Sequence, residues 1–286
     1  MYRTGWMSTQ TRAASATLII DTSYTSFYCF FKTKRWHDKQ YPERRDVVDW
    51  HLEKTFMERY ETNYLKLFDN IMKKNLIEWA DVVFVKDCYR DCVWRRSVYS
   101  EYKATREKNN RHFTGGLVFK ETHARILPKF EERGAKMIKV ATAEADDIIA
   151  VLCGCLRDSR TILLVSKDSD YFQLVEPGRI YLINVHNKLL KNRYTTGHKQ
   201  ADLLYKILNG DKSDNVPGCL SRSVTKKMCV QLSRTDAALQ DFLDKKKCRE
   251  TFERNQRLLD LAYVPASIRE EVTTWCRDVF SAYFKK

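Results

Sequence analysis

The sequence lacks an apolar run long enough to cross a bilayer, so no transmembrane helix and no membrane partner are expected. Its first residues, MYRTGWMSTQTRAASA, also lack the apolar block of a secretory signal, and we expect residues 1–16 to be a disordered lead-in. There is neither an internal repeat nor a low-complexity tract. These absences leave a folded globular chain.

Cysteines spaced for a metal are missing as well. The chain has nine cysteines, an odd number, and the only close pairs are Cys88 with Cys92 and Cys153 with Cys155. Neither spacing repeats as a zinc site requires. Free thiols in a reducing compartment are the simplest interpretation, so we expect an intracellular protein of the cytoplasm or nucleus.

What the chain has in excess is positive charge. It contains 51 Lys+Arg against 37 Asp+Glu, for a formal net charge of +14, and 43% of its residues are hydrophobic. That much apolar material can build a core, which argues against disorder. The charge favours a polyanionic partner, with nucleic acid first and an anionic membrane surface second, over a protein that is merely basic.

Five short apolar runs are typical of strands: TLIID (17–21), DVVFVKD (81–87), KMIKV (136–140), TILLVSKD (161–168) and RIYLINV (179–185). Helical patterns lie around 45–79 and 117–133 and over AEADDIIAVLCGCL. Alternation of this kind predicts an α/β fold with a mostly parallel sheet covered by helices. From about residue 199 the pattern is helical to the end. We therefore expect a core over 17–198 and a helical region over 199–286.

Carboxylates follow the predicted strands. Asp21 and Asp87 end two of them, EADD opens the helix after the third, and Asp168 and Asp170 follow the fourth. The loop GDKSDNVPG (210–218) carries two more. Any one of these is ordinarily a helix cap or a solvated loop acid. Ligands of parallel α/β sheets bind at the carboxyl ends of strands, and carboxylates crowded there need cations. Mg²⁺ or Mn²⁺ is the natural choice.

A basic protein with an acidic metal pocket points to phosphodiester chemistry, because two ions can clamp a scissile phosphate while Lys and Arg hold the backbone. The stretch CYRDCVWRRSVYSEYKATREKNNR (88–111) interleaves cations with aromatic residues, as contact with an unpaired strand requires. Standing alone, it would be interpreted as a solvated charged helix. Weaker basic patches lie at 186–199, 221–227 and 245–249.

Five motifs in order resemble the 5′→3′ exonuclease / flap endonuclease family of PIN-like 5′ nucleases, closest to its bacteriophage and DNA-virus members. They are LIIDTSY, VKDCYRDCVWRRSVYSEYKATR, TAEADDIIAVL, LLVSKDSDYFQLV and LNGDKSDNVPG. The resemblance covers most of the chain.

The resemblance implies a function and a set of site residues. The activity would be a Mg²⁺- or Mn²⁺-dependent, two-metal, structure-specific 5′ nuclease of DNA replication or repair. Its partner would be DNA with a 5′ flap, a nick or an RNA–DNA junction, with replication proteins as possible partners of a monomer. The metal ligands would be Asp21, Asp87, Glu144, Asp146, Asp147, Asp168, Asp170, Asp211 and Asp214. Lys103 and Arg106 would act with Asp168 in catalysis, and the DNA contacts would be Arg95, Arg96, Tyr102, Lys103, Arg106, Lys226 and Lys227.

The family fold implied is a PIN-like nuclease core with a helical arch or clamp, here at about 88–116, and a helix-hairpin-helix-like motif in the helical region. One departure concerns that hairpin. Ser221 and Ser223 stand where the family usually has glycines, often beside a potassium ion. Since serine is strained where glycine adopts positive φ, the departure argues against potassium binding and a tight grip on duplex DNA.

Two alternatives remain open. Asp168-Ser-Asp170 after a strand mimics the nucleophile motif of haloacid-dehalogenase-type phosphatases, although Phe172 stands where that motif has Thr or Val. A catalytically inactive nucleic-acid-binding relative is the other, and retention of the whole acidic set argues against it.

Overall fold

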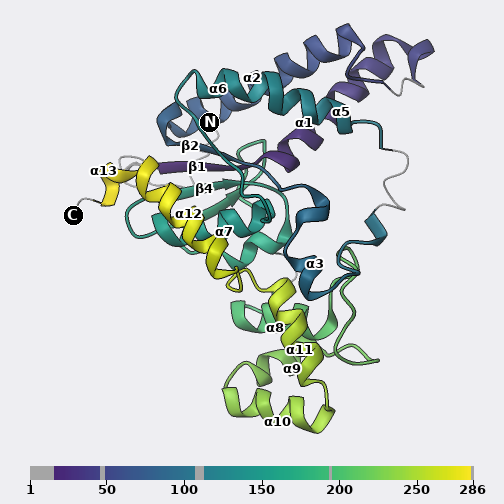
Figure 1. Ribbon diagram of the computed structural model, residues 1–286, viewed down its shortest axis with the longest axis vertical. Coiled ribbons are helices and arrows are strands. Elements are labelled where there is room, and N and C mark those ends of the chain that lie inside the picture. The colour runs from purple at the N-terminus through teal and green to yellow at the C-terminus, as the bar shows by residue number, and fades with distance from the viewer. Residues whose placement is uncertain (1–15, 46–48, 107–112, 193–194, 285–286) are drawn as a thin grey trace, which may run out of the picture.

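The computed structural model describes residues 16–45, 49–106, 113–192 and 195–284. Its centre is a five-stranded parallel sheet in the order β3-β2-β1-β4-β5 (Figure 1). The strands are β1 Ala16–Asp21, β2 Val82–Val85, β3 Lys136–Ile138, β4 Thr161–Val165 and β5 Ile180–Ile183. All five strands predicted from the sequence are present, and the predicted parallel α/β architecture is confirmed.

Helices cover both faces of the sheet, as Figure 1 shows. One face packs against α1 Thr22–Gln40, α2 Lys54–Asn75, α5 Gly116–Glu121 and α6 Leu127–Glu131. The other face packs against α7 Ala145–Leu156 and α12 Ala266–Val279. Because both faces are covered, β2 and β4 are buried along their whole length, which explains their unbroken apolar sequences.

The helices differ in detail from the sequence patterns. The pattern at 45–79 corresponds to α2, and that at 117–133 to α5 and α6 joined by a wider helical turn, Thr122–Ile126. The sequence patterns do not predict the 19-residue α1. Its sequence is rich in Ser, Thr and aromatic residues, which disfavour helix as isolated residues, and burial of its Cys29 and Phe30 in the core outweighs that preference.

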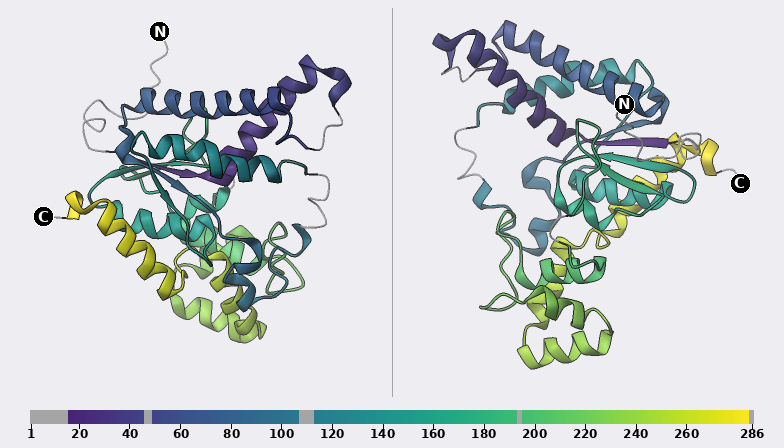
Figure 2. Two further views of the ribbon diagram at one scale, coloured as in Figure 1. Left: turned by 45° about the horizontal axis from the view of Figure 1, so that its top comes forward. Right: turned by 180° about the vertical axis from the view of Figure 1, so that it is seen from behind.

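The helical region forms a third cluster. It contains α8 Lys199–Asn209, α9 Lys226–Leu232, α10 Asp236–Lys246 and α11 Arg249–Leu259, gathered at the end of the molecule away from α1 and α2 (Figures 1 and 2). α8 and α9, joined by a hairpin, correspond to the expected helix-hairpin-helix-like pair. The chain then returns to the sheet, where α12 packs on α7 before α13 Ser281–Phe284. The expected region 199–286 is therefore divided between the outlying cluster and the core.

Two predicted segments fall partly outside the described residues. The lead-in over 1–16 is described only at Ala16, the first residue of β1. Of the arch at 88–116, residues 107–112 are not described, and the rest holds the short turn Arg90–Cys92 and α3 Arg95–Val98. Among the described helices, none has the length and apolar character needed to cross a membrane.

Candidate active site

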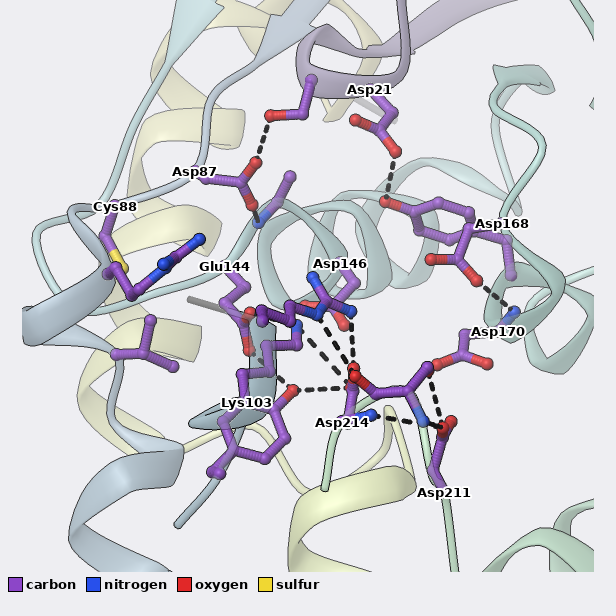
Figure 3. Close-up of a pocket in the computed structure, with 18 of the residues that line it drawn as sticks. Asp21, Asp87, Cys88, Lys103, Glu144, Asp146, Asp168, Asp170, Asp211 and Asp214 are labelled. Atoms are coloured by element: carbon purple, nitrogen blue, oxygen red, sulfur yellow. Dashed lines mark hydrogen bonds and ion pairs between the residues drawn. The ribbon is translucent and has the colours of Figure 1, made fainter. Parts of the chain in front are cut away.

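A single cavity of about 350 Å³ at the carboxyl edge of the sheet gathers eight of the nine predicted metal-ligand carboxylates (Figure 3). They come from strand ends, from the start of α7 and from the turn after α8. The eight are Asp21, Asp87, Glu144, Asp146, Asp168, Asp170, Asp211 and Asp214. Asp147 is the exception. Segments almost 200 residues apart in sequence thus supply one acidic site.

The sheet topology brings the first of these together. The strand order reverses between β1 and β4, and the crevice at such a point is where open α/β sheets bind ligands. Asp21 ends β1 and caps α1 by accepting the Tyr24 N–H at 3.1 Å. Asp87 follows β2 and accepts the Ala145 N–H at 2.8 Å, which ties it to the start of α7. Asp168 follows β4.

The start of α7 is fixed by a reciprocal cap. Glu144 precedes the helix, and its backbone N–H donates to Asp147 Oδ2 at 3.1 Å. Asp147 is fully buried and also accepts from the Trp94 indole N–H at 2.9 Å. One oxygen from each of Glu144, Asp146 and Asp147 lies within 4.8 Å of the others. Asp147 faces these protein donors and does not line the cavity, so its geometry is that of a residue that orients the other two.

Arg95 explains how so many acids tolerate burial. Its guanidinium lies 2.9 Å from Glu144, 2.8 Å from Asp147 and 3.5 Å from Asp146, and its side chain is 1% exposed. Burial by itself would raise the pKa of Asp146, but Arg95 and Lys103 bring it below its usual value. Arg95 is therefore an internal counter-charge.

Arg95 and Tyr102, two of the expected DNA contacts, are instead buried among protein partners, and Tyr102 also lines the cavity. Tyr102 is 2% exposed, and its hydroxyl lies 3.0 Å from Glu144 and 3.1 Å from Asp214. It bridges the carboxylates of the core and of the helical region. The alternating cations and aromatic residues of the stretch 88–111 predicted contact with an unpaired nucleic-acid strand. In the structure, part of this stretch instead builds the acidic site.

The turn 210–218 delivers the last two carboxylates. Gly210 has φ +72°, and a Cβ there would lie 2.3 Å from the Val216 carbonyl oxygen, so only glycine fits. Asp211 and Val216 exchange backbone hydrogen bonds of 2.8 Å, which closes the turn. Asp211 Oδ1 also accepts the Ser213 N–H at 2.8 Å. The turn is rigid enough to aim both acids back toward the sheet.

Lys103 and Arg106, two of the three predicted basic residues that line the cavity, pair with its carboxylates. Lys103 Nζ lies 2.5 Å from Glu144 and 3.7 Å from Asp214, and Arg106 lies 2.5 Å from Asp214. Lys103 has a left-handed backbone, φ 57°, and its N–H donates to the Asp214 carbonyl at 2.8 Å. A non-glycine residue held in that region signals a constrained position.

Lys206 is a site residue that the sequence analysis missed. From α8 it pairs with Asp170, and its Nζ lies 3.0 Å from Asp211. It thus stands between two acids as Lys103 does between Glu144 and Asp214. Its place one turn before the GDKSDN loop was the available signal, because i to i+4 or i+5 spacing puts a helix residue near the turn that follows.

The remaining predicted DNA contacts form no ion pair with the carboxylates of the cavity among the described residues. Arg96 lines the cavity and pairs with the exposed Asp91 at 3.0 Å. Lys226 and the exposed Lys227 begin α9. In the hairpin before them, Ser221 and Ser223 have no positive φ, so the backbone has taken a course that does not require glycine.

The residues present fit divalent cations, as judged from their electrostatics. Burial, then repulsion from Asp87, raises the pKa of Asp21 to about 7. The pKa of Asp170 rises to about 6 through burial and Asp168, in spite of Lys206. Hard oxygen donors whose charged forms are this unfavourable are what a divalent ion neutralises.

The residues that build the sheet and most of this cavity match a known family. A family model described as "5'-3' exonuclease, N-terminal resolvase-like domain" matches residues 16–203. The chain belongs to the 5′-3′ exonuclease family. It is 26% identical over 223 residues to the ribonuclease H of Enterobacteria phage T4, covering 72% of each chain. It is 30% identical over 164 residues to a 5′-3′ exonuclease of Halalkalibacterium halodurans, covering 54% of this chain and 50% of that one. As a member of this family, the chain is a phage-like nuclease and therefore a hydrolase.

Solved structures agree on the fold. The T5 5′-exonuclease with bound zinc superposes with a TM-score of 0.65 at 16% identity, over 92% of this chain and 99% of that one. A complex of the T5 flap endonuclease with DNA and metal ions gives 0.61 at 16% identity, over 92% and 98%. The shared fold extends through the helical region, of which the family model covers only residues 199–203.

Proposed function

We propose that the chain is a Mg²⁺- or Mn²⁺-dependent, structure-specific 5′ nuclease that hydrolyses phosphodiester bonds in flapped, nicked or primer-bearing DNA during replication or repair. The observation that carries the proposal is the convergence of eight carboxylates on one cavity whose rim bears Lys103 and Arg106. We also propose that the protein is a monomer and works in a reducing compartment. Its nine free thiols are consistent with such a compartment.

The carboxylates divide into two sets that would hold two ions. Asp21, Asp87, Glu144 and Asp146 would form the first set and Asp170, Asp211 and Asp214 the second, with Asp168 between them. When bound, such ions activate water and stabilise the leaving oxygen of a phosphodiester. Tyr102 and Arg95 would orient the first set from behind.

The basic residues have a separate task in this proposal. Lys103 and Arg106 neutralise carboxylates in the protein alone, and each can turn to the phosphate once cations relieve them. They would hold the scissile phosphate and offset its developing charge. Lys206 would likewise neutralise Asp170 and Asp211 in the protein alone. It would keep the two carboxylates apart yet aimed at one point.

Cleavage of a labelled 5′-flap DNA tests the function. With Mg²⁺ we expect cutting near the flap junction to leave 5′-phosphate and 3′-hydroxyl ends. A chelator should stop it, and an excess of Mg²⁺ or Mn²⁺ should restore it. An intact flap would contradict the nuclease, and undiminished cutting in chelator would contradict the metal. Hydrolysis of a small phosphomonoester without flap cleavage would favour the phosphatase alternative.

Replacing Lys103 tests the role of the cavity cations. Lys103→Ala should slow single-turnover cleavage by about 100-fold or more, the usual effect of removing one preorganised transition-state contact. Duplex binding should change much less, because the helical region remains. Lys103→Arg, which keeps the charge, serves as the control. Equal losses in rate and in duplex affinity would show that Lys103 only binds DNA.

A further inference from the structure

A pair of lysines stands at the carboxyl edge of two neighbouring strands. β2 and β3 pair in parallel with Val85 opposite Ile138, and the next residues are Lys86 and Lys139. The Lys86 N–H donates to the Ile138 carbonyl at 3.0 Å, so the pairing continues to this point. Like charges side by side on a sheet are unfavourable. An anion bound between them removes that cost.

Two more groups from other segments join the pair. Lys139 Nζ lies 3.8 Å from the centre of the Tyr89 ring, and Tyr89 is 73% exposed. His123, an exposed residue on the turn Thr122–Ile126, has its pKa lowered to about 4 by partial desolvation and then by the charges of Lys86 and Lys139. We call Lys86, Tyr89, His123 and Lys139 the β2–β3 basic edge.

Acidic groups near this edge are few. The negative charge of Glu131 favours the charged form of Lys86, and that of Asp87 favours the charged form of His123. Lys139 has no carboxylate within ion-pair distance among the described residues. Tyr89 is among the most exposed large side chains that the structure describes, and it carries a cation on its face. An aromatic ring and cations left open together are the elements of a platform for unpaired bases and their phosphates.

The basic edge adjoins the carboxylate cavity. Asp87 directly follows Lys86 and lines the cavity together with Arg90. Figure 3 shows Asp87 and Cys88 on the side of the cavity opposite Asp211, which comes from the helical region. The basic edge therefore borders the cavity on the side opposite Asp211.

We propose that the β2–β3 basic edge is a subsite for single-stranded nucleic acid. Lys86 and Lys139 hold backbone phosphates, His123 donates a hydrogen bond to the same backbone, and Tyr89 stacks on a base. The base is unpaired, because a base pair covers the face that Tyr89 needs. The subsite rests on the proposed function, and it assigns the unpaired 5′ strand to the β2 side of the cavity.

The test compares two DNA ligands by fluorescence anisotropy in chelator, using the full chain. One carries an unpaired 5′ strand and the other is the same nicked duplex without it. The Tyr89→Ala, Lys139→Ala double variant should lose about fivefold or more in affinity for the flapped ligand, as removal of a stacking platform predicts. Its salt-dependence slope should fall by about 0.7, because one phosphate is no longer neutralised by Lys139. Affinity for the flapless duplex should be unchanged.

Control variants distinguish a failure of the proposed subsite from a failure of the proposed nuclease function. Lys66→Ala, at an exposed lysine on α2, makes the same charge change away from the edge and should behave as wild type. Tyr89→Trp, Lys139→Arg should restore binding. If wild type cuts the flap with Mg²⁺ but the Ala variant binds both ligands normally, the subsite is wrong and the nuclease stands. Equal losses on both ligands also overturn the subsite, and failure of wild type to cut or to bind overturns both.

Discussion

Asp168→Ala is expected to lower the rate of 5′-flap cleavage by more than about 100-fold. Asp168 follows β4, beside the point where the strand order reverses, and lines the cavity; in the proposed function it serves both sets of carboxylates. Substituting a residue that merely orients a metal ligand already lowers metal affinity or activity by about 10–100-fold. Removing a carboxylate that is placed to serve both sets should lower the cleavage rate further. Single-turnover cleavage with saturating Mg²⁺ measures the effect.

A second exposed carboxylate separates chemistry from folding. Asp168 is exposed, and its side chain accepts the backbone N–H of Asp170, two residues along the chain, so its removal should leave the fold intact. Asp158→Ala is the matched control, because that exposed carboxylate pairs with Arg179 away from the cavity. If Asp168→Ala cuts as fast as Asp158→Ala, the assignment of the cavity as the catalytic site fails, even if the wild type is a nuclease.

The sequence predicted most of the acidic site because its members mark strand ends. Asp21, Asp87 and Asp168 each follow an apolar run, and parallel strands bring their carboxyl ends to one edge whatever the loops do. Asp211 and Asp214 could not be placed this way, since no strand precedes them. Only the resemblance to a family joined them to the site, and Gly210 supplies the physical reason that their turn points there.

What the sequence could not show is which cations are buried. Arg95 and Arg96 are neighbours of the same type in the same basic stretch, yet one is enclosed and the other pairs with an exposed acid. The choice depends on Glu144 and Asp147, about 50 residues later, and on the fit of α11 against α3. Lys206 was missed for a related reason, because its place before the GDKSDN loop puts it near that turn but does not show that it also pairs with Asp170.

The different burial of Arg95 and Arg96 predicts the second large effect, a loss of stability. Arg95→Met should lower the free energy of unfolding by about 3–5 kcal/mol, the usual cost of leaving buried charges without their partner. Glu144 and Asp147 would both be deprived of their closest guanidinium, and the Leu258 carbonyl of α11 would no longer accept the 2.9 Å hydrogen bond from Arg95 Nε. Urea unfolding of the metal-free protein measures the change.

Arg96→Met is the matched control, with the same substitution one residue along. Its ion pair with Asp91 is exposed on one side, so the loss should stay below about 1 kcal/mol. If Arg95 acts as the internal counter-charge, Asp147→Asn should cost less in the Arg95→Met background than in the wild type, because the two changes remove one interaction. Additive costs would mean that Arg95 stabilises the junction through α11 alone. Equal costs for the two arginines would instead mean that Arg95 is not enclosed, and its role as a DNA contact would return.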